Sequence, residues 1–123
     1  MPDRNELQKT FEMYVAAYRM GDAQGCAAVF LPDAVMMSPY GPTATGRDEI
    51  AAQHADWVGE GSEGKRLEIV AHGGARDVAW ALAAFSEGEA TGEGTSLCVF
   101  ERQPDGRWLI RMCSLNASGL SAA

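Results

Sequence analysis

The sequence predicts an α+β domain in which helices come first and an antiparallel sheet follows. Apolar residues recur at helical spacing in the first half, whereas short segments alternate between apolar and polar residues in the second half. A Gln-Pro-Asp-Gly sequence at 103–106 predicts a tight turn between the last two strands. The chain has 123 residues, the size of one domain. We therefore expect a single domain over residues 1–123, with residues 117–123 as a frayed tail.

Capping and stop signals divide the first half into three predicted helices. The first begins at Asp3, with an acidic residue three positions later as in a capping box, and ends at Gly21. The second begins at Asp22 and is predicted to continue to Pro32. The third spans 47–58 and carries an apolar stripe on one face.

The remaining segments predict strands and loops. An apolar run predicts a first strand, and the segment 39–46, which is rich in proline and glycine, is interpreted as a loop. A second, polar loop is expected at 59–65. The predicted strands cover residues 34–38, 66–72, 78–87, 95–102 and 107–116.

Composition limits the partners that this chain is expected to have. The net charge of −7 disfavours nucleic acid, since phosphate binding requires a basic surface. No apolar segment is long enough to cross a bilayer, and residues 1–10 lack a signal-peptide core, so we expect a cytoplasmic protein without a membrane partner. The three cysteines form no CxxC pair, and the histidines lie apart, so we expect reduced thiols, no bound metal and no cofactor.

Four segments, in this order, resemble those of a known superfamily. They are YVAAYRMGD at 14–22, AAVFLPDAVMMSP at 27–39, GRDEI at 46–50 and PDGRWLI at 104–110. Together they resemble the nuclear-transport-factor-2-like (NTF2-like) superfamily, in its SnoaL-like and ketosteroid-isomerase-like branch. The resemblance implies a cone-shaped, cystatin-like fold, in which a strongly bent sheet wraps around three helices and leaves an apolar pocket.

The resemblance also implies where catalytic groups would lie. The tyrosine of the isomerase oxyanion hole corresponds to Tyr14, the general base corresponds to Ser38, and the second oxyanion donor falls on or near Cys98. A serine hydroxyl cannot take a proton from a carbon acid without another base. We therefore expect no ketosteroid isomerase activity.

His54 is the second candidate catalytic residue. It lies on the apolar stripe of the third helix, and we expect it to hydrogen-bond to Tyr14 inside the pocket, with its second ring nitrogen facing a ligand. In an enzyme, His54 would then be a general acid or base and Tyr14 a donor to a carbonyl oxygen. In a binding protein the same pair would anchor an oxygen of the ligand. A histidine that only stabilises the helix is the simplest alternative.

Further residues are candidates for the wall of the pocket, although the aromatic ones fit a plain hydrophobic core equally well. The predicted ligand-binding residues are Tyr18, Ser38, Tyr40, Trp57, Trp80, Cys98, Phe100, Met112 and Asn116.

Two classes of function remain open. The first is an isomerase, cyclase or dehydratase that acts on a small apolar carbonyl compound; the second is a non-catalytic ligand-binding or dimeric accessory module. In both, the partner is a small apolar molecule. The alternation of Leu97 and Val99 with Cys98 and Phe100 gives both faces of one strand apolar groups, so we also expect a homodimer through the convex face of the sheet.

Overall fold

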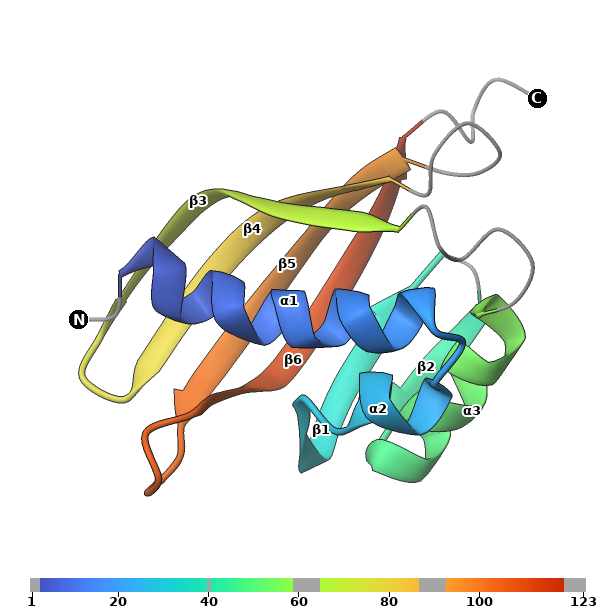
Figure 1. Ribbon diagram of the computed structural model, residues 1–123, viewed down its shortest axis with the longest axis horizontal. Coiled ribbons are helices and arrows are strands. Elements are labelled where there is room, and N and C mark those ends of the chain that lie inside the picture. The colour runs from blue at the N-terminus through green and yellow to red at the C-terminus, as the bar shows by residue number, and fades with distance from the viewer. Residues whose placement is uncertain (1–2, 40, 59–64, 87–92, 119–123) are drawn as a thin grey trace.

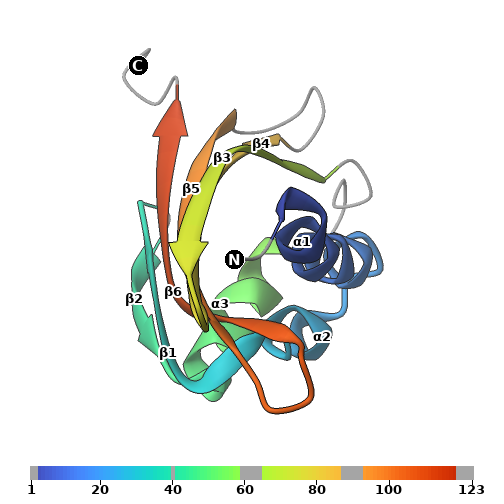
Figure 2. The same cartoon turned by 90° about the vertical axis from the view of Figure 1, so that its left-hand side faces the viewer.

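A strongly bent six-stranded sheet encloses one long helix on its concave side, and two shorter helices pack at one end of the sheet (Figures 1 and 2). This arrangement comes from a computed structural model that describes residues 3–39, 41–58, 65–86 and 93–118. The elements are α1 (Arg4–Arg19), α2 (Ala23–Ala27), β1 (Phe30–Ser38), β2 (Gly41–Thr45), α3 (Arg47–Trp57), β3 (Arg66–Ala75), β4 (Val78–Ser86), β5 (Glu93–Arg102) and β6 (Trp108–Ser118). The α+β class and the expected cone are confirmed.

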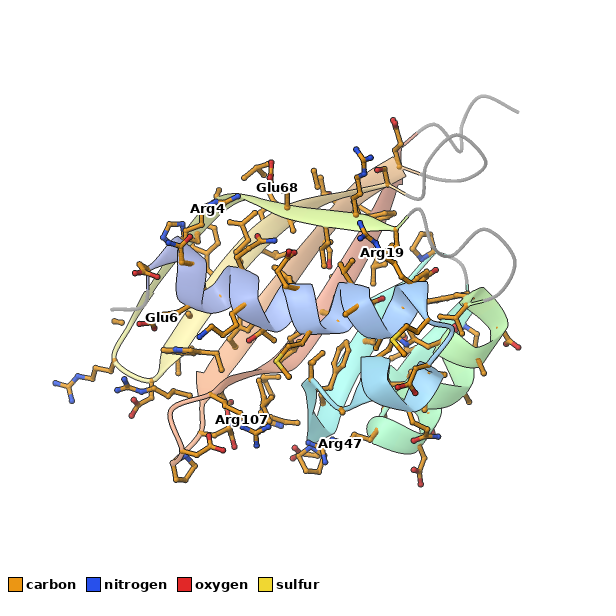
Figure 3. The ribbon with its side chains drawn as sticks, in the orientation of Figure 1. Arg4, Glu6, Arg19, Arg47, Glu68 and Arg107 are labelled. Atoms are coloured by element: carbon orange, nitrogen blue, oxygen red, sulfur yellow. The ribbon has the colours of Figure 1, made fainter. Side chains whose placement is uncertain are left out.

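The long helix α1 begins and packs as its sequence predicts. The side chain of Asp3 accepts a hydrogen bond of 2.9 Å from the backbone N–H of Glu6. The apolar face of α1 is buried against the sheet. Its two terminal arginines bond to β3 and to the residue just before it: Arg4 donates to the carbonyl of Ile69, and Arg19 donates to that of Lys65 (Figure 3). These bonds hold both ends of α1 against β3.

The sheet has the order β2-β1-β6-β5-β4-β3 and is mixed. Strands β1 and β6 run parallel, and every other neighbouring pair is antiparallel. The expected sheet was wholly antiparallel, so it differs at this one pair. The two parallel strands are separated by most of the chain, and only tertiary packing brings them together.

Several predicted boundaries differ from those in the structure. Helix α2 ends at Ala27, and β1 begins at Phe30 rather than residue 34, because the carbonyl of Val29 and the backbone of Phe30 pair with Ile110 of β6. Residues 41–45, expected in a loop, form strand β2, which tolerates Pro42 because it lies at the edge of the sheet. Strand β6 continues to Ser118, so the first two residues of the predicted frayed tail are paired; residues 119–123 lie outside the described chain.

In the described part of the chain, no helix is both long and apolar enough to cross a membrane. The hydrophobic core lies between α1 and the concave face of the sheet, and it includes Leu7 and Phe11 of α1 with Phe30, Phe100 and Ile110 of the strands. A site for small molecules therefore requires a place where this core is incompletely filled.

Candidate functional site

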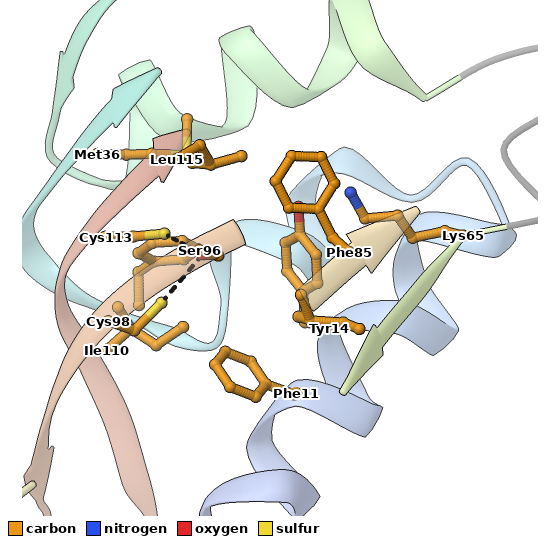
Figure 4. Close-up of a pocket in the computed structure, with 12 residues that line it drawn as sticks. Phe11, Tyr14, Met36, Lys65, Phe85, Ser96, Cys98, Ile110, Cys113 and Leu115 are labelled. Carbon is orange, nitrogen blue, oxygen red and sulfur yellow. Dashed lines mark hydrogen bonds between the residues drawn. The ribbon is translucent and has the colours of Figure 1, made fainter. Parts of the chain in front are cut away.

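A cavity lies between α1 and the concave face of the sheet, where β1 and β3 to β6 contribute to its wall (Figure 4). It contains about 350 Å³ of space not filled by atoms, part of it open to solvent, and the centre of a water molecule can reach about 20 Å³ of this space. That is room for roughly one ordered water. Its apolar wall consists of Phe11, Phe30, Met36, Leu67, Phe85, Ile110 and Leu115, and its polar groups belong to Tyr14, Lys65, Ser96, Cys98 and Cys113.

Tyr14 and His54 form the hydrogen bond that the sequence analysis expected. The Tyr14 hydroxyl and Nε2 of His54 are 2.8 Å apart, and both side chains are buried. The other ring nitrogen, Nδ1, lies 2.8 Å from the carbonyl oxygen of Ile50. A carbonyl oxygen only accepts, so Nδ1 carries the proton of the neutral ring and Nε2 accepts from Tyr14.

The electrostatics of this pair agree with that assignment. Burial, with a smaller contribution from the charge of Lys65, lowers the pKa of His54 from 6.5 to about 4, against the opposing effect of the bond to Ile50. Burial raises the pKa of Tyr14 well above its ordinary value. His54 is therefore a neutral imidazole near pH 7, and Tyr14 keeps its proton.

One part of the prediction for His54 is wrong. Its second ring nitrogen does not face a ligand, because the bond to the Ile50 carbonyl within α3 occupies it. His54 does not line the cavity, whereas Tyr14 does. Since Tyr14 donates its only proton to His54, its oxygen offers a ligand lone pairs rather than a donor. His54 thus orients the Tyr14 hydroxyl without itself lining the cavity.

Lys65 is a cavity residue that the sequence analysis placed in a solvated loop. Its side chain is buried, and Nζ lies 4.6 Å from the ring centroid of Tyr18 and 4.7 Å from that of Phe85. Lys65 directly precedes β3 and lies two residues before Leu67 and four before Ile69, which are buried on the inward face of that strand. Extending the alternation of β3 backward by two residues would have predicted that Lys65 also points inward.

A second polar group lies across the cavity, on β5 and β6. Cys98 and Cys113 are directly opposite each other in the antiparallel register. The hydroxyl oxygen of Ser96 lies 3.4 Å from the sulfur of Cys98 and 3.0 Å from that of Cys113 (Figure 4). All three side chains are buried and line the cavity. Of these three residues, only Cys98 was predicted to line the pocket.

Four other predicted residues lie near the cavity or in the core rather than in its wall. Tyr18 is buried beneath Lys65. Trp57 packs on His54 with ring centroids 4.8 Å apart. Phe100 belongs to the core, where its ring meets that of Phe11 edge-on at 5.3 Å. Ser38, at the end of β1, is half-buried and is not among the lining residues. Tyr40 lies outside the described residues.

Three predicted pocket residues are on the other face of the sheet. Trp80 and Met112 are 41% and 36% exposed, and both pair with Val99, so they form one row on the convex side. A bulge shifts the register between β5 and β6 after Val99, and beyond it Cys113 and Leu115 point into the cavity. Asn116 therefore points outward and is exposed.

The chemistry of the cavity is limited by its residue types. None of the lining residues in the described chain is an aspartate or glutamate. In the same part of the chain, no group of three or more histidine, cysteine or acidic side chains could hold a metal ion. What the cavity offers is an ammonium group, the acceptor oxygen of Tyr14, and a hydroxyl between two thiols.

The bent sheet around α1, with a cavity at its centre, defines the class of NTF2-like, cystatin-like proteins. The match to the family model described as the SnoaL-like domain covers residues 11–110, and the chain belongs to this family. No curated protein matches the chain.

Solved structures agree with this fold. The chain is similar to a domain of unknown function with a cystatin-like fold from Nostoc punctiforme, at 23% identity and a TM-score of 0.77, over 98% of this chain and 80% of that one. It is similar to a ketosteroid isomerase-like protein from Erwinia carotovora atroseptica, at 17% identity and a TM-score of 0.75, over 93% and 95%. It is also similar to an NTF-2 like protein of unknown function from Shewanella oneidensis, at 19% identity and a TM-score of 0.74, over 90% of this chain and 96% of that one. At these identities the likeness concerns the fold.

Proposed function

We propose that the protein binds one compact, mostly apolar molecule through a carboxylate or carbonyl oxygen that contacts Lys65. The observation that carries this proposal is the buried lysine in the wall of an otherwise largely apolar cavity. Pockets for small molecules are mostly apolar, with a few polar groups that orient the ligand. The empty space of about 350 Å³, part of it open to solvent, supports a small ring or short chain rather than a steroid.

Lys65 suits an acceptor group of a ligand. A buried ammonium group is costly unless neighbouring groups compensate for the lost water. The ring faces of Tyr18 and Phe85 supply part of this compensation. A ligand oxygen carrying full or partial negative charge would add a charge-assisted hydrogen bond on the cavity side. The backbone of Lys65 is held by Arg19, whose Nε donates to its carbonyl at 2.9 Å, so the start of β3 is positioned for this contact.

Binding without turnover is the function that the polar groups support best. An isomerase or cyclase needs a base that faces the substrate. Both ring nitrogens of His54 are bonded within the protein, and Tyr14 gives its proton to His54. These bonds support a structural role for His54 and an acceptor role for Tyr14, and they favour the ligand-binding module over the enzyme.

The test is binding of benzoate, and of benzyl alcohol as its uncharged counterpart, measured by ligand-detected NMR. We expect benzoate to bind the native protein and to lose at least about ten-fold in affinity in Lys65→Met, the change expected for one lost charge-assisted bond. Lys9→Met is the matched control: Lys9 is the only other lysine, lies exposed on α1 and changes the net charge equally. Equal binding by native protein and Lys65→Met would refute the proposal, as would an equal loss in Lys9→Met.

We also propose that the protein forms a homodimer through the convex face of the sheet. Trp80, Leu97 and Met112 are 41%, 44% and 36% exposed there, and the register links Met112, Val99 and Trp80 in one row and Leu97 with Leu82 in the next. A continuous apolar face of this kind is typical of an interface. In a two-fold dimer the same surface of both copies meets, so we expect this face to pack against its own counterpart in a second copy.

Light scattering tests the dimer. We expect a mass of about twice 13.1 kDa for the native protein and a monomer for Leu97→Lys. Met20→Lys, which makes the same change in charge at an exposed residue at the end of α1, is the control and should stay dimeric. A native protein that elutes as a monomer at micromolar concentration would contradict this proposal.

A further inference from the structure

Two thiols meet inside the cavity, at a point that the proposed ligand contact with Lys65 does not use. Cys98 and Cys113 occupy directly opposed positions on the antiparallel strands β5 and β6, and both side chains point to the concave side. Directly opposed residues in such a pair have Cα atoms roughly 4.5–5.5 Å apart. Disulfides span Cα separations of about 4.4–6.8 Å. The backbone therefore already has the spacing that a bond between the two sulfurs needs.

The hydroxyl of Ser96 distinguishes the two thiols. It lies 3.0 Å from the sulfur of Cys113 and 3.4 Å from that of Cys98. A hydroxyl has one proton, so it donates to only one of the two sulfurs at a time. When Ser96 donates across its shorter contact, to Cys113, the bond stabilises a thiolate at Cys113.

The thiol pKa values follow the same order. Hydrogen bonds from Cys98 and Ser96 lower the pKa of Cys113 against the opposing effect of its burial. Burial raises the pKa of Cys98 well above its ordinary value. Burial also raises the pKa of Cys26, the third thiol, to about 12; Cys26 does not line the cavity, and its sulfur lies 3.9 Å from the backbone oxygen of Tyr14.

We propose that Cys98 and Cys113 form a redox-active dithiol, in which Cys113 reacts with a peroxide that enters the cavity and Cys98 resolves the product as a cross-strand disulfide. The Cys113 sulfur attacks one oxygen of hydrogen peroxide, which gives a sulfenic acid and releases water. The Cys98 sulfur then displaces the hydroxyl group, so that the disulfide forms and a second water leaves. In total, two thiols and one peroxide give one disulfide and two waters.

The size of the cavity selects the oxidant. Cys98 and Cys113 are only 1% and 5% exposed, so a reagent must reach their sulfurs through the cavity. The narrow cavity admits small molecules such as hydrogen peroxide, whereas a bulky disulfide such as oxidised glutathione does not fit. The disulfide would cross the cavity floor between β5 and β6.

The experiment treats the reduced full-length protein with an equimolar amount of hydrogen peroxide, followed by denaturation, maleimide labelling and peptide mapping by mass spectrometry. The expected product has lost two hydrogens, links Cys98 to Cys113 and retains one labelled thiol at Cys26. Cys26→Ser is the matched control and should form the same link at the same rate. A link that involves Cys26, a link between chains, or three unreacted thiols would overturn the proposal.

Two single variants test the separate roles. In Cys98→Ser, peroxide should leave a sulfenic acid on Cys113 that dimedone traps. In Cys113→Ser, peroxide consumption should fall at least ten-fold. Equal reactivity of the two variants would overturn the assignment of Cys113 as the attacking thiol.

Arsenite binding can be measured on the native protein, so this test does not depend on whether a variant folds. It exchanges two hydroxyl groups for the sulfurs of two thiols, whose protons leave with the hydroxyl groups as two waters, and therefore binds firmly only where two thiols lie side by side. We expect one arsenite for each chain by native mass spectrometry. No bound arsenite would show that the sulfurs do not meet. Neither this readout nor the peroxide reaction depends on ligand binding at Lys65.

Discussion

The buried histidine predicts a loss of stability in mild acid. His54 is fully buried, and its pKa falls from 6.5 to about 4 mainly because burial disfavours the charged ring. Between these two values the unfolded chain takes up a proton that the folded chain does not. The stabilising effect is therefore complete above pH 6.5 and is lost as the pH falls toward 4.

The magnitude follows from the two pKa values. At about 1.4 kcal/mol for each pH unit between them, the full effect is roughly 3 kcal/mol. Because the proton uptake is progressive, we expect a loss of roughly 1 kcal/mol at pH 5.5 and of roughly 2–3 kcal/mol at pH 4.5. The exposed carboxylates Asp33 and Asp105, whose pKa values are lowered by bonds to Arg111 and Arg107, contribute mainly at lower pH.

Urea unfolding at pH 7.5, 5.5 and 4.5 measures this loss. In His54→Gln the side chain does not titrate, so its free energy of unfolding should change much less across the same range, whatever its value at pH 7.5. His72→Gln is the control for the other histidine and should keep the native pH dependence. Parallel losses in the native protein and His54→Gln would refute the reasoning.

Three further outcomes follow from the same geometry. Tyr14→Phe leaves Nε2 of His54 without its donor, so the free energy of unfolding should fall by roughly 1–3 kcal/mol in urea denaturation; an unchanged midpoint would contradict this. In Gly73→Ala the new Cβ would come within 2.7 Å of the Trp80 ring, so the ring should move outward and its fluorescence should shift to longer wavelength, whereas an unchanged spectrum would show that the ring does not rest on Gly73. With Ser38 at the position that the family resemblance assigns to the base, a β,γ-unsaturated ketosteroid should not be converted; turnover near that of a true isomerase would show that another group acts as base.

Much of the secondary structure could be predicted because it depends on neighbouring residues. The cap at Asp3, the helical spacing of Leu7, Phe11 and Tyr14, and the turn at 103–106 are local signals, and the structure has each of them. The meeting of Tyr14 and His54 was predictable for a related reason: each lies on the inward stripe of its own helix, and a buried hydroxyl needs a partner.

Other features depend on groups that are distant in sequence. The strand at Phe30 begins where it does because Ile110 of β6 is available to pair, and the strand at 41–45 exists because it can add to the edge of β1. Neither partner is visible in the local sequence.

The chain's sequence by itself determined the α+β class, the family and the inward face of α1, since these follow from short-range periodicity and from motifs in a recognisable order. Only the tertiary structure decided which strand faces line the cavity. One bulge between β5 and β6 places Cys113 opposite Cys98 in the cavity and turns Met112 outward, because a register shift of one residue exchanges the two faces of a strand. The bond from His54 to the Ile50 carbonyl likewise decided that this histidine supports Tyr14 rather than a ligand.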